Sequence, residues 1–392
     1  MGRLARDQGT WNANHPRWRL LKAIDGFRSY RDANKAEVDR WREAYRHVGK
    51  DQKKLLESPA VNYRQKLNTL DHLIDRNALL SDAIAAHAQS FYAVSDPELS
   101  EFARDEAEAG RPAERVSVVQ ALKHYVRDWS VEGARERDPA FACLLRTLEG
   151  LYPDRLDGGN NNASAPPARV LVPGAGLGRL GYEVEALGGF EVTINEWSTY
   201  MIAAYRYLES HPAADSHVLH PFIDSLSHHA TTTDLQRPIV FPSPESASLL
   251  NDPSRVLLVE GDFTTVFSSS SSSGSYDVII TYFFLDTARN LLSYLDTVFR
   301  LLRPGGHWLN LGPLLYGTGP WVQLSLDEIV RVTEDMGFEL LDLDPVCGEP
   351  TFPGDAGSLG KVQGMEAIYG SNARGLTKSS YMAQSWVAQK AE

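Results

Sequence analysis

The sequence predicts an α/β protein in which a parallel sheet follows a helical N-terminal region. Residues 1–150 are rich in Ala, Leu, Arg, Glu and Asp, and apolar side chains recur there at helical spacing, as at Leu67 and Leu70. From Arg169 onward, short apolar runs alternate with helical patterns, which is the order expected for a parallel sheet. We therefore expect a helical region over residues 1–150 and a sheet domain over residues 151–392.

A glycine-rich turn follows the apolar run at residues 170–172 and opens a helical pattern. Its glycines fall at Gly174, Gly176 and Gly178, so the turn reads G-x-G-x-G. Part of the turn, from Gly176 to Gly181, also matches the dinucleotide pattern G-x-G-x-x-G, but in that pattern the first glycine directly follows the strand, and here Pro173 and Gly174 come first. The turn therefore favours S-adenosyl-L-methionine (AdoMet) over a dinucleotide and indicates a Rossmann-like sheet. An ordinary strand–helix turn is the remaining alternative.

Two later apolar runs are followed by acidic residues that suit an adenosine ligand. Glu196 ends the second run, where a carboxylate can accept hydrogen bonds from two ribose hydroxyls. Asp262 follows the next strand, and we expect it to accept from the adenine amino group while the backbone N–H of Phe263 reaches a ring nitrogen. The alternative for Asp262 is a helix N-cap, a position that Asp also favours.

Another predicted strand, at residues 276–282, places Tyr282 and Asp286 at or just past the cofactor edge of the sheet. The acid that often stands two positions before the first glycine of an AdoMet loop is replaced here by Val172. The methionine carboxylate must therefore bind elsewhere, and Arg127 is a candidate, with His124 one helical turn before it. The alternative for both residues is a solvated helix face.

Composition and charge narrow the classes of function. The formal net charge is −12 and the pI is about 5.4, whereas nucleic-acid-binding proteins usually carry a basic face, so we expect no nucleic-acid partner. The two cysteines, Cys143 and Cys347, fall in no metal-ligand spacing. We therefore expect no metal, and two unpaired thiols that suit a reducing cytosol or nucleus.

Three further segments complete the expectations. No apolar run reaches the roughly 18 residues of a membrane span, and the N-terminus lacks an apolar signal core. We expect a cytoplasmic protein with no membrane partner, and the nucleus is a second candidate location.

Residues 211–254 are polar and weakly periodic, which predicts an excursion inserted into the sheet domain. The six-serine run at residues 268–273 predicts a surface loop without an assigned function.

Together these motifs resemble the carnosine N-methyltransferase family, whose members use AdoMet to methylate the imidazole of β-alanyl-L-histidine and give anserine. The resemblance extends from about residue 115 to the C-terminus and implies a class I methyltransferase fold. The motifs that carry it are Val126-Arg-Asp-Trp-Ser130, Val170-Leu-Val-Pro-Gly-Ala-Gly-Leu-Gly-Arg-Leu180, Asn195-Glu-Trp-Ser198, Arg237-Pro-Ile239, Gly261-Asp-Phe263, Phe283-Phe-Leu-Asp-Thr-Ala288 and Asn310-Leu-Gly-Pro-Leu-Leu-Tyr316.

The resemblance also implies particular site residues. The cofactor contacts that it places on this chain are His124, Arg127, Gly174, Glu196, Asp262, Phe263 and Tyr282. At two of these positions the family often has other residues, namely glutamine in place of His124 and cysteine in place of Tyr282. The implied dipeptide contacts are Asp286 and Tyr381. The family also has a substrate-binding histidine after Pro-Leu-Leu-Tyr, and this chain has Gly317 there.

The implied reaction is transfer of a methyl group to a neutral imidazole, which is already a nucleophile near pH 7. We expect Asp286 to accept the N–H of the other ring nitrogen, and the N-terminal helices to pack over the cofactor site as a lid. Two alternatives remain for the function. One is an AdoMet-dependent methyltransferase that acts on another small molecule or on protein histidine. The other is a non-catalytic binding module on the same fold.

Overall fold

The computed structural model describes residues 5–156, 166–317, 319–370 and 372–392, and these form two compact units. The helical unit comprises the chain up to Glu132, Thr199–Ala247 and Asn372–Thr377; the sheet unit comprises the rest. The predicted boundary near residue 150 differs from this division, because helix α7 (Ala134–Leu151) belongs to the sheet unit.

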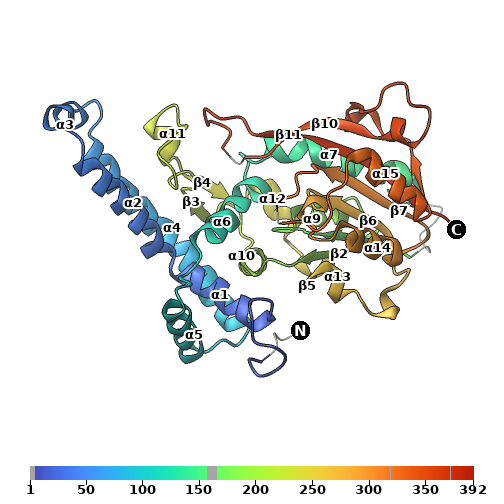
Figure 1. The fold of residues 1–392 in the computed structure, drawn as a ribbon, viewed down its shortest axis with the longest axis horizontal. Coiled ribbons are helices and arrows are strands. Elements are labelled where there is room, and N and C mark those ends of the chain that lie inside the picture. Colours follow the sequence, from blue (N-terminus) through green and yellow to red (C-terminus); the bar gives the residue numbers. More distant parts are fainter. Residues whose placement is uncertain (1–4, 157–165, 318, 371) are drawn as a thin grey trace. The chain divides into compact units, whose positions relative to one another are not determined.

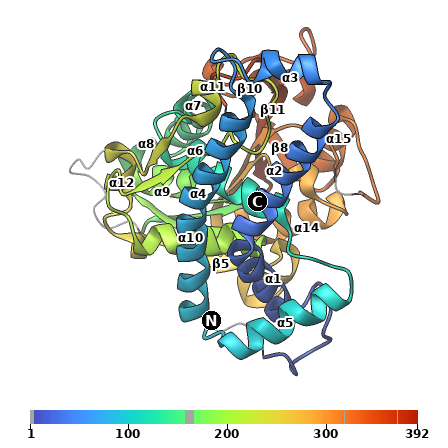
Figure 2. The same ribbon diagram turned by 90° about the vertical axis from the view of Figure 1, so that its left-hand side faces the viewer.

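The helical unit is built around the long helix α4. Helices α1, α2 and α10 pack against α4, and Figure 2 shows α2 alongside it. The apolar spacing seen in the sequence accounts for this packing, since Leu67, Leu70 and Ile74 of α4 are all buried. The elements of this unit are α1 (Pro16–Arg28), α2 (Tyr30–Arg46), α3 (Lys50–Leu56), α4 (Tyr63–Phe91), α5 (Asp96–Glu108), α6 (Arg115–Trp129), α10 (Thr199–Ser210), β3 (His217–Leu219), α11 (Thr232–Gln236), β4 (Ile239–Phe241) and the start of α12 (Pro244–Leu249).

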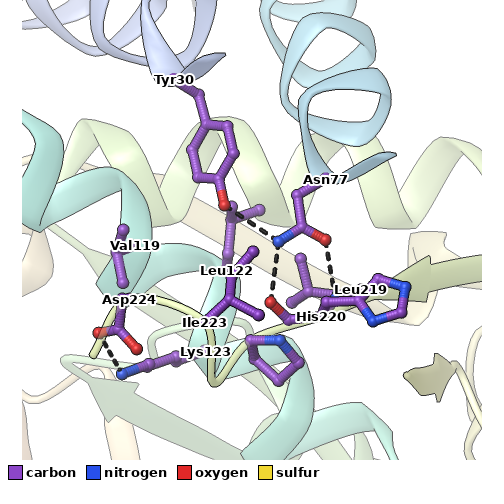
Figure 3. Close-up of a pocket in the computed structure, with 10 residues that line it drawn as sticks. Tyr30, Asn77, Val119, Leu122, Lys123, Leu219, His220, Ile223 and Asp224 are labelled. Atoms are coloured by element: carbon purple, nitrogen blue, oxygen red, sulfur yellow. Dashed lines mark hydrogen bonds and ion pairs between the residues drawn. The ribbon is translucent and has the colours of Figure 1, made fainter. Parts of the chain in front are cut away.

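Strands β3 and β4 belong to the segment that was predicted to leave the sheet. They pair with each other in a separate two-stranded sheet. A small cavity of about 10 Å³, roughly the room of one water molecule, lies near β3 (Figure 3). Beside it the Asn77 amide donates to the Tyr30 hydroxyl (3.0 Å) and to the His220 carbonyl (2.8 Å), and accepts from the His220 N–H (2.8 Å). Burial raises the pKa of Tyr30 to about 12. The hydrogen bonds of Asn77 with His220 join α4 to the inserted segment. The cavity beside them is too small for a ligand.

The sheet unit holds a nine-stranded sheet with the order β5-β2-β1-β6-β7-β11-β10-β9, in which β8 pairs with β11. Figure 1 shows β2, β5, β6, β7, β10 and β11 of this sheet. Adjacent strands from β5 to β7 in this order run parallel to each other. Strand β11 pairs antiparallel with β7, and β10 pairs antiparallel with β11. The strands are β1 (Ala168–Pro173), β2 (Phe190–Glu196), β5 (Val256–Glu260), β6 (Tyr276–Tyr282), β7 (Leu302–Gly312), β8 (Phe338–Leu341), β9 (Glu349–Pro350), β10 (Gln363–Ile368) and β11 (Ser380–Lys390). The α/β class and the parallel sheet predicted from the sequence are confirmed.

Helices α7, α9, α14 and α15 pack against strands of this sheet. The helices of the sheet unit besides α7 are α8 (Pro153–Leu156), α9 (Arg179–Ala186), α13 (Phe263–Val266), α14 (Leu291–Leu301) and α15 (Leu326–Asp335). Its short 3₁₀ helices are η1 (Pro253–Arg255), η2 (Ser270–Ser272), η3 (Leu285–Thr287), η4 (Pro345–Cys347) and η5 (Ser358–Lys361). The six-serine run is mostly exposed around η2, as predicted for a surface loop. None of the helices in the described ranges has the length and apolarity needed to cross a membrane.

The two cysteines correct an expectation. Cys143 of α7 and Cys347 of η4 form a disulfide across 204 residues of sequence, with their Cα atoms 4.7 Å apart, so the prediction of two unpaired thiols is wrong. Both residues are buried because α7 packs against η4, a contact that no local sequence pattern reveals. Because the cysteines are paired, unpaired thiols no longer support a reducing compartment. The cellular location stays a prediction.

Candidate active site

The glycine-rich turn after β1 requires glycine for its backbone conformation. Gly174, Gly176 and Gly178 have φ values of 66°, 58° and 80°, in the left-handed region that residues with a Cβ seldom adopt. Space is also restricted at the first of them, because a Cβ on Gly174 would lie 2.4 Å from the ring of Phe284. The turn is therefore fixed by both conformation and packing, and helix α9 begins directly after it.

Glu196 ends β2, the strand that pairs with β1, and its carboxylate is held by three backbone N–H groups. One oxygen accepts from Gly176 at 2.8 Å, and the other accepts from Trp197 at 2.8 Å and Ser198 at 2.7 Å. The residue is only 8% exposed. Hydrogen bonds to an ionised carboxylate are among the stronger ones in proteins, so the glycine turn and the end of β2 fix the orientation of this side chain.

Asp262 follows β5, the strand on the other side of β2, and serves as the N-cap of α13. Its carboxylate accepts from the backbone N–H of Thr264 at 2.9 Å and from the Thr264 hydroxyl at 2.5 Å. Asp262 therefore caps α13, and its predicted contact with adenine stays a prediction. Phe263, the next residue, is buried and meets Phe284 and Tyr294 edge-on, with ring centroids 5.4 and 5.6 Å away.

These elements surround a cavity of about 620 Å³ within the sheet unit, a volume typical of small-molecule sites. The cavity brings together four of the predicted cofactor residues, Gly174, Glu196, Asp262 and Phe263. The other lining residues were not predicted from the sequence. They are Asn195, Trp197, Thr264, Phe283, Phe284, Thr287, Arg289, Asn290, Ser293, Tyr294 and Trp321. Many of them follow β6, and the sequence pattern did not predict them because their place in the site depends on how the chain turns after that strand.

Phe283 is the least expected of these residues. It has a φ of 50°, which is uncommon for a residue with a bulky side chain. Its ring stacks on Tyr369 at 5.2 Å between centroids and lies 5.9 Å from the ring of Tyr381. Backbone strain of this kind often accompanies a functional site. Phe283 therefore connects the cavity to Tyr381, one of the predicted dipeptide contacts.

Asp286 lies on η3, three residues after Phe283. Burial raises the pKa of its carboxyl to about 6, while the backbone N–H groups of Asp286 itself and of Leu315 act in the opposite direction. Asp286 is not among the described residues that line the cavity, although Phe284 and Thr287 on either side of it are. The structure thus places a carboxylate with an altered pKa between two residues that line the cavity, as expected of a functional group.

The remaining predicted contacts of the sheet unit also lie outside the described lining of the cavity. Tyr282 ends β6, and its ring meets Phe141 of α7 edge-on at 5.6 Å. Tyr381 lies in β11, opposite Ala367 of β10. Gly317 is exposed, and a Cβ there would find only the Leu315 carbonyl, at 3.9 Å. The contacts of Tyr282, Gly317 and Tyr381 with ligands stay predictions.

His124 and Arg127 lie on α6 in the helical unit. The Arg127 guanidinium pairs with Asp128, with Nε 2.6 Å from Oδ1. The His124 ring is 2.7 Å from the Gln120 carbonyl, and burial together with the nearby Arg127 charge lowers the pKa of His124 to about 4. Because these residues and the cavity belong to different units, their role as cofactor contacts and the packing of the helices over the site also stay predictions.

The residues around the cavity fit AdoMet chemically. Adenosine presents hydroxyl and amino donors, and two carboxylates from the neighbouring strands β2 and β5, Glu196 and Asp262, line the cavity as acceptors. Phe263 supplies an apolar surface beside them. In the described part of the chain, no group of three or more His, Cys, Asp or Glu side chains is placed to hold a metal ion. The fold and the site define an AdoMet-dependent methyltransferase.

Comparison with known proteins identifies the family. The family model described as carnosine N-methyltransferase matches residues 105–392. The carnosine N-methyltransferase of Schizosaccharomyces pombe is 32% identical over 320 residues, which cover 78% of this chain and 82% of that relative. The one from Mus musculus is 32% identical over 326 residues, covering 81% and 77%. The chain therefore belongs to the carnosine N-methyltransferase family.

Solved structures are more distant. That of Haemonchus contortus phosphoethanolamine N-methyltransferase 2 with phosphomonomethylethanolamine and S-adenosylhomocysteine aligns at 13% identity and a TM-score of 0.39, over 71% of this chain and 58% of that chain. A likeness at this level has no bearing on the site.

Proposed function

We propose that this enzyme methylates an imidazole nitrogen of carnosine, β-alanyl-L-histidine, to give anserine, and that it also accepts related histidine dipeptides. The observation that carries the proposal is Asp286, a partly buried carboxylate with a pKa of about 6 that stands between two residues lining the cavity, Phe284 and Thr287. At pH 7 most of this carboxylate is ionised, so it can accept a hydrogen bond from an imidazole N–H. The names of the relatives, carnosine N-methyltransferases, support the choice of substrate.

The chain's own residues supply orientation and electrostatics. AdoMet, when bound, provides a methyl group on a sulfonium, and neutral imidazole is a sufficient nucleophile for it near pH 7. The Asp286 carboxylate accepts the N–H of the ring nitrogen that does not react, which selects the tautomer with a lone pair on the other nitrogen and orients the ring. As the ring gains positive charge, the same carboxylate stabilises it. The N–H proton then leaves to Asp286 or to water, which restores a neutral ring.

A direct assay tests the proposal. Purified protein, shown by calorimetry to bind AdoMet, is incubated with methyl-labelled AdoMet and with carnosine, other histidine dipeptides or histidine-containing proteins. We expect label on the imidazole of carnosine and, more weakly, of related dipeptides. Label on proteins but on none of the dipeptides would favour a protein-histidine methyltransferase. Binding of AdoMet without any methylation would favour a non-catalytic module.

Gly317 provides a prediction about substrate affinity. Gly317→His should lower the KM for carnosine about threefold to tenfold with little change in kcat, because the family histidine would add one neutral hydrogen bond. The backbone can accept this side chain, since Gly317 does not have a left-handed φ and a Cβ there meets no atom closer than 3.9 Å. Gly150→His, at another glycine with open space around it, is the matched control. An unchanged KM for the Gly317 variant would show that this position does not contact the dipeptide.

A further inference from the structure

Arg289 brings a positive charge to a cavity whose other charged groups are acidic. It follows η3 and lines the cavity together with Glu196 and Asp262. Among the described lining residues, it alone carries a permanent positive charge. Both acids already accept hydrogen bonds from backbone N–H groups near them. The cavity therefore offers an anion a single strong partner, and that partner is three residues from Asp286.

The Arg289 guanidinium has no acidic partner within the described ranges of the chain, where no carboxylate oxygen lies within 4.0 Å of it. Its neighbour is Trp321, whose ring centroid lies 6.0 Å from the guanidinium carbon. The backbone N–H of Trp321 also donates to the Arg289 carbonyl at 2.7 Å. Trp321 thus fixes the backbone of Arg289 and lies near its side chain, and Arg289 is exposed, so its N–H donors are accessible. Although Trp321 lines the cavity, it is 72% exposed.

The stability of the fold gives no reason for a positive charge at this position. Arg289 immediately precedes Asn290, the N-cap of α14, and a cation near the N-terminus of a helix opposes the helix dipole. Some other arginines of the sheet unit form ion pairs, as Arg179 does with Glu183 and Arg303 with Asp277. Arg289 is thus exposed, placed unfavourably for its helix and part of the cavity lining, an arrangement that suits a ligand as its partner.

We propose that Arg289 binds the carboxylate of the dipeptide substrate and makes the enzyme selective for histidine derivatives that retain this group. The inference rests on the proposed function and extends it. A guanidinium binds a carboxylate through two parallel N–H···O hydrogen bonds, a geometry that a lysine cannot reproduce. In a C-terminal histidine the imidazole and the carboxylate belong to one residue. Asp286 then binds the first group and Arg289 the second, from one short stretch of chain after β6.

The test compares carnosine with its decarboxylated analogue β-alanylhistamine, which has the same imidazole and no carboxylate. Arg289→Met keeps much of the side-chain length and removes the charge. We expect this variant to raise the KM for carnosine about tenfold to a hundredfold, as for the loss of a charge-assisted hydrogen bond. The KM for β-alanylhistamine should change less than about twofold, since no bond to it is lost. Arg289→Lys should recover part of the affinity for carnosine.

The control is Arg331→Met, which removes the same charge from an exposed position on α15, where Arg331 pairs with Asp327. Calorimetry with AdoMet alone provides a readout that is independent of turnover, and the affinity should be the same in the Arg289 and Arg331 variants. Weaker AdoMet binding in Arg289→Met would assign the arginine to the methionine carboxylate and overturn the proposal. An equal rise in KM for both imidazole compounds, or no rise for carnosine, would overturn it as well. Failure of the proposed function appears separately, as wild-type protein that binds AdoMet and methylates neither compound.

Discussion

Replacing Asp286 by asparagine should lower kcat for carnosine about tenfold to a thousandfold, the range seen when one preorganised electrostatic group is lost. The amide keeps the shape of the carboxylate, but it can present an N–H to an imidazole N–H that needs an acceptor. It also removes the negative charge that stabilises the ring as it becomes positive. AdoMet affinity, measured by calorimetry, should stay near normal. Asp296→Asn, on the exposed side of the nearby helix α14, is the matched control.

The pH dependence of the same variant gives a second readout. The Asp286 carboxyl has a pKa of about 6, and a free imidazole has one of about 6.5. Activity needs the ionised carboxylate and the neutral ring, so kcat/KM of the wild type should fall with a slope approaching two below about pH 6. In Asp286→Asn only the ring titrates, and the slope should be one. A fully active variant with the wild-type profile would remove Asp286 from the mechanism.

The raised pKa also predicts the sign of the effect on stability. The folded protein holds the Asp286 proton up to about pH 6, whereas the unfolded chain releases it near the ordinary value of 3.8. Stability from this group is therefore present at low pH and is lost as the pH rises through this window. At pH 7 the wild type carries a partly buried charge that Asp286→Asn lacks. The variant should consequently be at least as stable to heat as the wild type, although it is less active.

Replacing Glu196 by alanine should weaken AdoMet binding about tenfold to a hundredfold, because one charge-assisted hydrogen bond to the ligand contributes roughly 1.5–3 kcal/mol. The change also leaves the N–H groups of Gly176, Trp197 and Ser198 without their acceptor. Calorimetry with AdoMet measures the loss. Glu191→Ala is the control, since Glu191 lies on the same strand with its side chain 61% exposed.

Two outcomes would contradict this prediction. Unchanged AdoMet affinity in Glu196→Ala would mean that the carboxylate only supports the turn. Tighter binding of NAD than of AdoMet by the wild type would mean that the glycine turn had been assigned to the wrong cofactor. Glu196→Gln distinguishes a role in supporting the glycine turn from a role in binding AdoMet. The glutamine amide keeps one acceptor oxygen for the backbone N–H groups and loses the negative charge.

The parts of the site that could be predicted depend on local patterns. Glu196 and Asp262 each follow an apolar run, and the glycine turn lies between a strand and a helix, so their places at the edge of the sheet follow from the order of elements. The role of Arg289 could not be predicted in this way, because it depends on Trp321 and on how the chain turns after β6. The left-handed backbone conformation of Phe283 likewise could not be predicted from the sequence pattern.

The fold shows the same division between local and long-range information. The strands and the parallel sheet were predictable because each apolar run has its own pattern. The Cys143–Cys347 disulfide was not, since its partners are 204 residues apart. Pairing also decides the end of α14: the helix stops at Leu301, and the turn-like residues Arg303–Gly306 form an irregularity in register within β7.

The three backbone hydrogen bonds to Glu196 have a consequence for the thermodynamics of binding. They immobilise the carboxylate, so the predicted hydrogen bonds from ribose would cost little further rotamer entropy. The cost of ordering this acceptor is met during folding. Binding energy from the predicted adenosine contacts would then appear as affinity, with the glycine turn and the end of β2 acting together as a preorganised receptor.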